Sequence, residues 1–114
     1  MTKVVVHSGV CGFSVTVTAE KGKDKKILIS LETECEMVEK MAEEISVMDM
    51  MAVFTRFLDN PVYRSASKHL KHVTCPVPSG ILKAMEVEAG FALPKDVSIT
   101  FLESRKISAS SKEE

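Results

Sequence analysis

The most regular part of the sequence is Phe13-Ser14-Val15-Thr16-Val17-Thr18-Ala19-Glu20-Lys21-Gly22-Lys23-Asp24-Lys25-Lys26-Ile27-Leu28-Ile29-Ser30-Leu31-Glu32. It contains two runs in which apolar residues recur at every second position. This period is typical of a half-buried β-strand, because successive side chains point to opposite faces. The charged segment between the runs predicts a hairpin turn near Gly22, which places Gly12 opposite Thr33. This hairpin is the centre of the predicted fold.

Further elements are predicted on both sides of the hairpin. Residues 3–7 are rich in valine and form a first strand, and residues 97–101 alternate strictly as a last strand. Helix-start signals and the helical spacing of apolar residues predict three or four helices in between. These helices begin at Thr33, with Glu36 completing a capping box, at Asp49, at Val62 and at Pro76.

The order of these elements, βββ-ααα(α)-β, indicates an α+β fold. We expect a four-stranded, mainly antiparallel sheet with three or four helices packed on one face. Residues 1–103 are predicted to form a single domain. Residues 104–114 are rich in Ser, Lys and Glu and are predicted to form a flexible polar tail.

The composition excludes several classes of protein. The chain has 114 residues, a net charge of −1 and no Trp, so we expect neither a basic nucleic-acid surface nor a base-stacking platform. No apolar run approaches the ~20 residues that span a membrane, and the N-terminus lacks a signal-peptide pattern. Three cysteines without a secretory signal argue against a disulfide framework. We therefore predict a cytoplasmic protein that binds neither nucleic acid nor membrane.

The three cysteines are the candidate functional residues. Cys11 lies in a glycine-flanked turn, Cys35 in the first turn of a predicted helix, and Cys75 directly before a proline-started helix. Buried structural cysteines are more typical of strand interiors and of the apolar stripes of long helices. Free backbone N–H groups and the positive end of the helix dipole favour a sulfur anion at a helix start. The sequence therefore indicates a thiolate site, but no particular reaction.

Strand pairing can bring these cysteines together. With a turn near Gly22, Cys11 approaches Cys35 at one end of the hairpin. Cys75 joins them if the last strand runs antiparallel to the second strand. His72 adds an imidazole at His-x-x-Cys spacing, so that three sulfurs and one nitrogen would complete a tetrahedral zinc site or hold an iron–sulfur cluster. A metal site made of these four side chains is the first functional prediction.

Other interpretations of the same residues stay open. The cysteines can be unligated apolar residues, and His72 a surface histidine. Alternatively, Cys75 is a nucleophile with Cys11 or Cys35 as its resolving partner, which predicts a sulfur-transfer or thiol-redox protein. A third interpretation is a non-enzymatic interaction module that forms a homodimer through the apolar segment Met48–Leu58. The seven methionines fit core filling better than a soft-metal site.

Motifs around the cysteines resemble known families. Gly9-Val10-Cys11-Gly12-Phe13, Cys35 and Cys75-Pro76-Val77-Pro78 resemble a small family of uncharacterised proteins from anaerobic bacteria and archaea, over nearly all of residues 3–102. That resemblance implies no activity, and relatives often carry a further cysteine where this chain has Leu70. The Cys-Pro-x-Pro run from Cys75 is also similar to the motif of the TusA/SirA-like sulfur-carrier proteins, whose cysteine carries a persulfide. The second resemblance implies the sulfur-transfer alternative.

Overall fold

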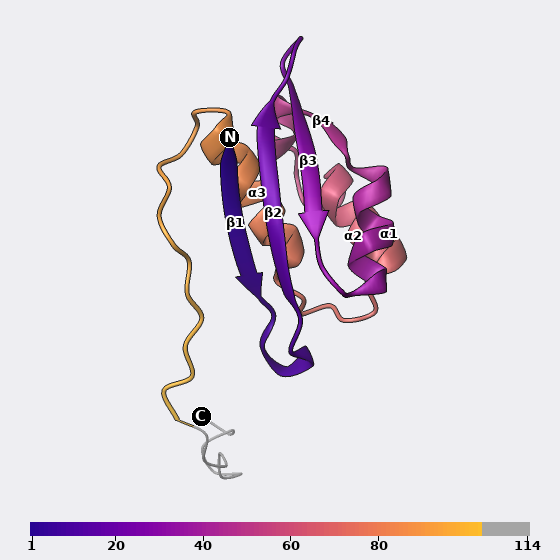
Figure 1. Ribbon diagram of the computed structural model, residues 1–114, viewed down its shortest axis with the longest axis vertical. Coiled ribbons are helices and arrows are strands. Elements are labelled where there is room, and N and C mark those ends of the chain that lie inside the picture. Colours follow the sequence, from indigo (N-terminus) through magenta and orange to yellow (C-terminus); the bar gives the residue numbers. More distant parts are fainter. Residues whose placement is uncertain (104–114) are drawn as a thin grey trace.

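The two alternating runs form the centre of a four-stranded antiparallel sheet in the computed structural model, which describes residues 1–103 (Figure 1). Each strand pairs with its neighbours in the chain, so the sheet is a meander. The strands are β1 (Thr2–His7), β2 (Ser14–Lys21), β3 (Lys26–Glu32) and β4 (Val47–Asp49).

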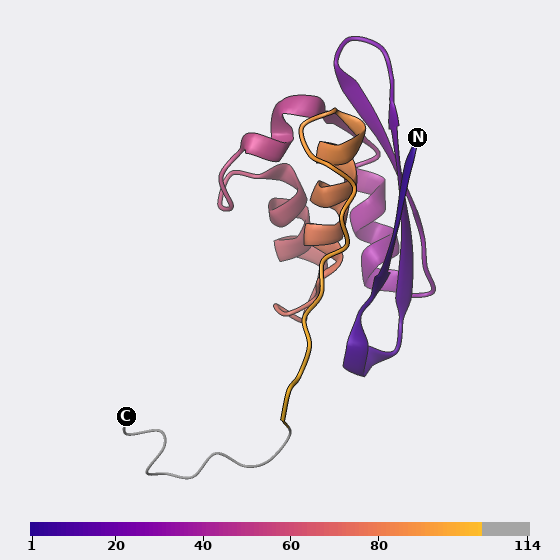
Figure 2. The same cartoon turned by 90° about the vertical axis from the view of Figure 1, so that its left-hand side faces the viewer.

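Three helices pack against one face of this sheet (Figure 2). α1 (Glu36–Glu44) contacts β3, and α3 (Val77–Glu88) contacts β1 and β2. α2 (Pro61–His69) packs against both α1 and α3. Two short 3₁₀ helices, η1 (Gly9–Cys11) and η2 (Met50–Phe54), lie in the connections. The predicted α+β architecture, with helices on one face of an antiparallel sheet, is confirmed.

The core lies between the sheet and the helices. Val15, Val17 and Ile27 point into it from the sheet and are almost completely buried. α1 contributes Met41 and α3 contributes Ile81, both of which are fully buried. Full burial of a large apolar side chain stabilises a fold by ~1.5–3 kcal/mol. These contacts hold α1 and α3 on the sheet, and with them the chain segments that carry two of the three cysteines.

The hairpin register differs from the prediction by three residues. Thr16 pairs with Glu32, which lies three positions beyond the partner that a turn near Gly22 predicts. Asp24 and Lys25 make the turn instead, with φ values of 56° and 60°. The prediction placed the turn at Gly22 because glycine adopts positive φ at the lowest cost. Here two residues with side chains adopt that conformation, so the turn lies further along the chain.

The fourth strand is not the one that the sequence predicted. β4 follows α1 and has three residues, of which Met48 is buried, so it is too short to be detected from periodicity. Residues 97–101 belong to no strand of the described chain and run extended along the outside of the molecule (Figure 1). The prediction that they form a last strand of this sheet is therefore wrong. Alternation shows that a segment can pair as a strand, but not that a partner strand is present.

Helix starts differ from the predictions by one to three residues. α1 begins directly after its N-cap residue Cys35, and the Thr33 hydroxyl accepts a hydrogen bond from the Cys35 N–H at 3.1 Å. α3 begins after its N-cap residue Pro76, so Cys75 lies one residue before the cap. Asp49 caps the following helix as predicted, although that helix is the short η2.

Gly90 lies just past the end of α3 and terminates the helix. Its φ is 85°, and its N–H donates to the Val87 carbonyl at 3.0 Å while the Phe91 N–H donates to the Glu86 carbonyl at 2.8 Å. This pair of bonds is the Schellman motif that satisfies the last carbonyl groups of a helix. Within residues 1–103, no helix has the length and apolar character needed to cross a membrane. The predicted flexible tail, residues 104–114, lies outside the described residues.

Candidate functional site

The segments that carry the three cysteines, η1 and the starts of α1 and α3, lie at one end of the sheet, opposite the turn between β2 and β3 (Figures 1 and 2). Cys11 ends η1, Cys35 precedes α1, and Cys75 precedes α3. α3 starts beside the end of β1, where Gly80 packs so closely on Val6 that no Cβ would fit. The packing of α3 on β1 therefore brings Cys75 to this end, and not a last strand as predicted.

Cys11 is the exposed member of the three. Its 3₁₀ turn lies between Gly9 and Gly12, whose φ values are 81° and 77°. The Gly12 N–H donates to the Gly9 carbonyl at 2.9 Å, and the Ser8 N–H donates to the Phe13 carbonyl at 3.1 Å. Residues with a side chain rarely adopt such φ values, so the shape of the turn depends on its two glycines. The turn presents the Cys11 side chain to solvent.

Cys35 is the buried member and belongs to the hydrophobic core. It is the N-cap residue of α1, and its carbonyl accepts a hydrogen bond from the Glu39 N–H at 3.0 Å. Its side chain makes no capping hydrogen bond. The position therefore combines the predicted helix start with the burial that is typical of an apolar cysteine, and both interpretations of Cys35 fit it.

Cys75 is half-buried, and its thiol responds to both other cysteines. The Cys75 N–H donates to the His72 carbonyl at 3.1 Å, which closes a turn before α3. Burial raises the pKa of the Cys75 thiol above its ordinary value, and Cys11 and Cys35 raise this pKa further. Cys11 and Cys35 thus lie within the range over which their charges act on the Cys75 thiol.

The direction of this pKa shift differs from the expectation for a cysteine at a helix start. The Val77 N–H does favour the charged form of Cys75, as expected, but burial acts in the opposite direction and is the larger effect. A raised pKa leaves the sulfur protonated, and the protonated thiol is a poor nucleophile. The environment of Cys75 therefore does not favour the sulfur-transfer alternative.

A hollow of about 420 Å³ separates the turn that carries Cys11 from the junction that carries Cys35. Its lining residues come from these two segments: Gly12, Phe13, Ser14, Thr33 and Glu34. The two segments thus face each other, as the hairpin predicts, although the register of the hairpin is different. None of the three cysteines is among the lining residues.

The predicted metal site is not preformed. Within residues 1–103, no group of three or more His, Cys, Asp or Glu side chains is arranged to hold a metal ion. Cys11 and His72 are both exposed at the surface, whereas Cys35 is buried. The structure thus gathers the three thiols in one region without closing them, or His72, around a single point.

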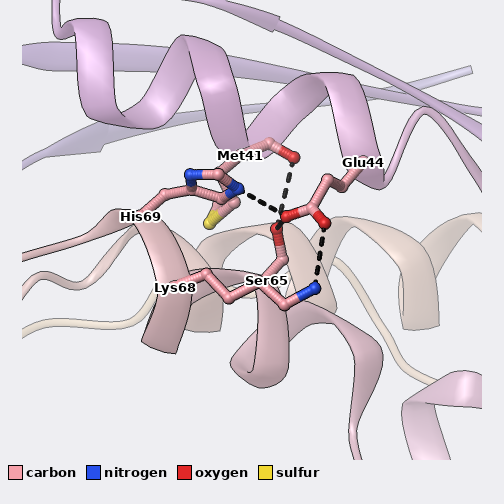
Figure 3. Close-up of polar contacts among 5 residues, drawn as sticks. All are labelled: Met41, Glu44, Ser65, Lys68 and His69. Atoms are coloured by element: carbon pink, nitrogen blue, oxygen red, sulfur yellow. Dashed lines mark hydrogen bonds and ion pairs between the residues drawn. The ribbon is translucent and has the colours of Figure 1, made fainter.

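A polar cluster that the sequence did not reveal joins α1 to α2 (Figure 3). Glu44 Oε1 accepts hydrogen bonds from Ser65 Oγ, at 2.8 Å, and from His69 Nε2. Lys68 Nζ lies 3.2 Å from Glu44 Oε2. Ser65, Lys68 and His69 together lower the pKa of Glu44 to about 2, and Ser65 has the largest effect. Because Ser65 and His69 both bind the carboxylate and not each other, this cluster is a clamp between helices and not a nucleophile–base pair.

Glu88 links α3 to the sheet at the end that is opposite the cysteines, as Glu44 links α1 to α2. Its carboxylate accepts hydrogen bonds from the Thr2 hydroxyl at 2.7 Å and from the Lys21 N–H at 2.9 Å. The N-terminal ammonium lies 3.3 Å away. The Thr2 hydroxyl and the Lys21 N–H lower the pKa of Glu88. The last turn of α3 is thus attached to the start of β1, which orients the whole helix along that strand.

Comparison with known families adds an assignment. The model for a Family of unknown function (DUF6951) matches residues 2–101. The chain belongs to this family. Membership of DUF6951 confirms the resemblance to an uncharacterised family over nearly the whole described chain, and it brings no activity with it. No curated protein and no solved structure matches the chain. The resemblance of the Cys75 motif to sulfur carriers stays a prediction for this DUF6951 protein.

Proposed function

We propose that this protein binds a soft metal ion, either zinc or the iron of an iron–sulfur cluster, through Cys11, Cys35 and Cys75. The observation that carries the proposal is that three separate cysteine-bearing segments, η1 and the starts of α1 and α3, lie at one end of the sheet, and that Cys11 and Cys35 both act on the pKa of Cys75. Thiolates are the preferred ligands of both zinc and iron–sulfur clusters. His72, in the loop before Cys75, is the proposed fourth ligand.

The electrostatics of the three thiols favour a cation. Two thiols and burial raise the pKa of Cys75, and the groups that act on it include a backbone N–H but no lysine or arginine of the described chain. A bound cation would replace the repulsion between thiolates by attraction to each of them, and binding would release the thiol protons. The same features that penalise an isolated thiolate at Cys75 therefore support metal binding there.

Formation of the site requires the turn that carries Cys11 to close. Cys35 and Cys75 lie at helix starts that are attached to the core, so their backbone positions are set by packing. Cys11 is exposed on a turn bounded by Gly9 and Gly12. Glycine allows the φ changes that would carry this turn across the neighbouring hollow. The proposed site thus has two ligands in fixed positions, Cys35 and Cys75, and a third, Cys11, on a turn that can adjust.

Zinc titration of the anaerobically reduced full chain, in competition with a chromophoric chelator, tests the proposal. We expect one zinc ion per chain. Cys11→Ser, Cys35→Ser and Cys75→Ser should each weaken binding by more than the roughly 10–100-fold that loss of an outer-shell partner costs. Reconstitution of the same protein with iron and sulfide, followed by visible absorbance, distinguishes a cluster from a zinc ion.

A pair of histidine variants tests the fourth ligand. His72→Gln should weaken zinc binding, whereas His69→Gln is the matched control, because His69 is the last residue of α2 and is bound to Glu44 of α1. The proposal is overturned if reduced protein binds neither zinc nor a cluster. It is also overturned if all three serine variants bind metal as tightly as the wild type.

Homodimer formation through Met48–Leu58 is a second candidate, because this segment is more exposed than its composition predicts. Phe57 is 73% exposed and Leu58 is 90% exposed. They border a groove of about 660 Å³ whose lining includes Tyr63 and Leu82. Contiguous exposed apolar surface of this kind is typical of interaction sites. If the segment forms the dimer interface, Leu58→Asp should give a monomer in light scattering.

A further inference from the structure

Residues 97–101, Val-Ser-Ile-Thr-Phe, have the pattern of a strand but no partner strand in the described chain. Val97, Ile99 and Phe101 are 64%, 85% and 90% exposed, and alternate residues of an extended segment share one face. Within residues 1–103, none of these five residues takes part in a backbone hydrogen bond. An extended segment with an exposed apolar face is a typical element for pairing with another chain.

β1 provides a free edge for such pairing. It is the outer strand of the sheet and pairs with β2 on one side. Every second residue of an edge strand directs its N–H and C=O groups away from the sheet, where they can accept an added strand. Natural edges are often protected by proline, bulges or several lysines. β1 contains no proline, and Lys3 is its single lysine, so this edge has little such protection.

The side chains of the two segments match on both faces. Val4 and Val6 of β1 point toward the helices and are only partly buried. A strand added outside β1, with its three apolar residues on the helix side, would cover the exposed flanks of these valines. Its alternate residues, Ser98 and Thr100, would then extend the open face of the sheet, where β2 places Thr16 and Thr18.

The segment does not occupy the edge of its own chain. The chain leaves α3 at Gly90, near the end of the sheet where β1 begins, and runs past β1 at a distance (Figure 1). Figure 2 shows that it descends beside the helix layer and not in the plane of the sheet. The connector of residues 91–96 contains Pro94 and carries the segment away from the body. An exposed segment outside its own sheet can reach the same edge of a second copy.

We infer that residues 97–101 form a fifth strand on β1 of a second copy of this chain, and that reciprocal exchange gives a two-fold symmetric dimer. Exchange of identical elements between copies is a low-cost route to such dimers. Each dimer then contains two equivalent strand pairings, and both β1 edges are covered. The inference goes beyond the proposed metal site, because that site lies at the start of α3 and the exchanged segment follows its end.

Light scattering coupled to size-exclusion chromatography of the full chain, over a range of concentrations, tests the inference. We expect a dimer for the wild type and about 100-fold weaker association for Ile99→Pro, because proline removes an N–H group and disrupts a strand. Ile99→Val keeps a β-branched residue and should keep the dimer. Since Ile99 is exposed in the single chain, neither substitution disturbs the core.

Leu58→Asp and amide hydrogen exchange separate this interface from the alternatives. We expect Leu58→Asp to remain dimeric, and the amides of residues 97–101 to be protected in the wild type but not in Ile99→Pro. Zinc affinity should be the same in Ile99→Pro and wild type, which separates this test from that of the metal site. A monomeric wild type overturns the inference, whether residues 97–101 are unprotected or are protected by pairing with their own β1. A dimer that Leu58→Asp dissociates and Ile99→Pro does not also overturns it.

Discussion

Glu44 and Cys75 are both titratable side chains at helix ends, but their surroundings act on their charges in opposite directions. Three side chains from α2 surround Glu44, and they lower its pKa to about 2. Cys75 is half-buried, and burial, together with the charges of Cys11 and Cys35, raises its pKa. The charged form of Glu44 is thus fully compensated within the protein, whereas the charged form of Cys75 is not.

This difference separates a structural cluster from a candidate binding site. A carboxylate that already has its donors gains little from an added ligand and serves to hold α1 against α2. Neighbouring thiols without a compensating charge are the place where a bound cation changes the energy most. The polar residues of the α1–α2 contact therefore contribute to stability, whereas the thiol at the start of α3 belongs to the proposed binding site.

Gly80→Ala is the variant that should separate the two regions most clearly. An added Cβ would collide with a methyl group of Val6, so either that side chain changes its rotamer or α3, and with it Cys75, moves away from β1. Overpacking of this kind typically costs about 1–3 kcal/mol, whereas alanine is favoured over glycine in a helix by about 1 kcal/mol. We therefore expect a net loss of unfolding free energy in urea titrations, together with weaker zinc binding.

Gly22→Ala is the matched control for this prediction. The nearest atoms to an added Cβ at Gly22 lie at 3.6 Å, an ordinary contact distance, so stability and zinc binding should change little. If Gly80→Ala is as stable as the wild type or more stable, the close packing of α3 on β1 does not position Cys75 as described.

Glu44→Gln tests the clamp through its dependence on pH. The pKa of Glu44 is about 2 in the folded protein and 4.5 as its ordinary value. A lowered pKa stabilises the fold above pH 4.5, and this contribution is lost as the pH falls toward about 2. We expect Glu44→Gln to lower the Tm at neutral pH and to make the loss of Tm on acidification smaller. Glu88 contributes in the same sense and is present in both proteins.

The neighbouring Glu43→Gln is the control for the acid titration, because Glu43 is an exposed residue of the same helix turn. Its Tm should follow that of the wild type at every pH. An acid profile of Glu44→Gln that is identical to the wild-type profile would show that the hydrogen bonds drawn in Figure 3 do not stabilise the native state.

The smallest expected effect concerns alkylation of metal-free protein by iodoacetamide. Because the pKa of Cys75 is raised above its ordinary value of 9.0, its thiol should react slowly at neutral pH and faster only in alkaline solution. The exposed Cys11 should react first. Peptide mass spectrometry over a time course measures both rates. Rapid labelling of Cys75 at neutral pH would contradict this environment and favour the sulfur-transfer alternative.

The sequence predicted the elements of the fold better than their pairing. β2, β3, α1 and α3 each bury one face. The apolar spacing that produces this face lies within a short stretch of sequence, so it can be read without knowing the tertiary structure. The hairpin register depended on whether Gly22 or the pair Asp24 and Lys25 would adopt positive φ, which periodicity does not determine. Residues 97–101 have the right pattern but lack a partner, and a pattern cannot supply one.

The location of the candidate site could be predicted from the sequence, but the burial and the pKa of its cysteines could not. Cys11 and Cys35 were placed at one end by the hairpin, although with a different register, and Cys75 was placed there by the wrong element. The burial of Cys35 and the raised pKa of Cys75 arise from packing between distant segments. The clamp was missed because a glutamate in the last turn of a helix is unfavourable in isolation, and its compensating donors come from a different helix.

The meander topology also determines when the thiols meet during folding. β1, β2 and β3 pair with their neighbours in the chain, so these pairings require short loop closures and can form early. α3 docks on β1 across a much longer loop, as shown by the hydrogen bond between Thr2 and Glu88. On the ribosome, α3 emerges after the strands that it covers. Cys75 therefore reaches the end of the sheet that carries Cys11 and Cys35 only when α3 docks, which is a late step in folding.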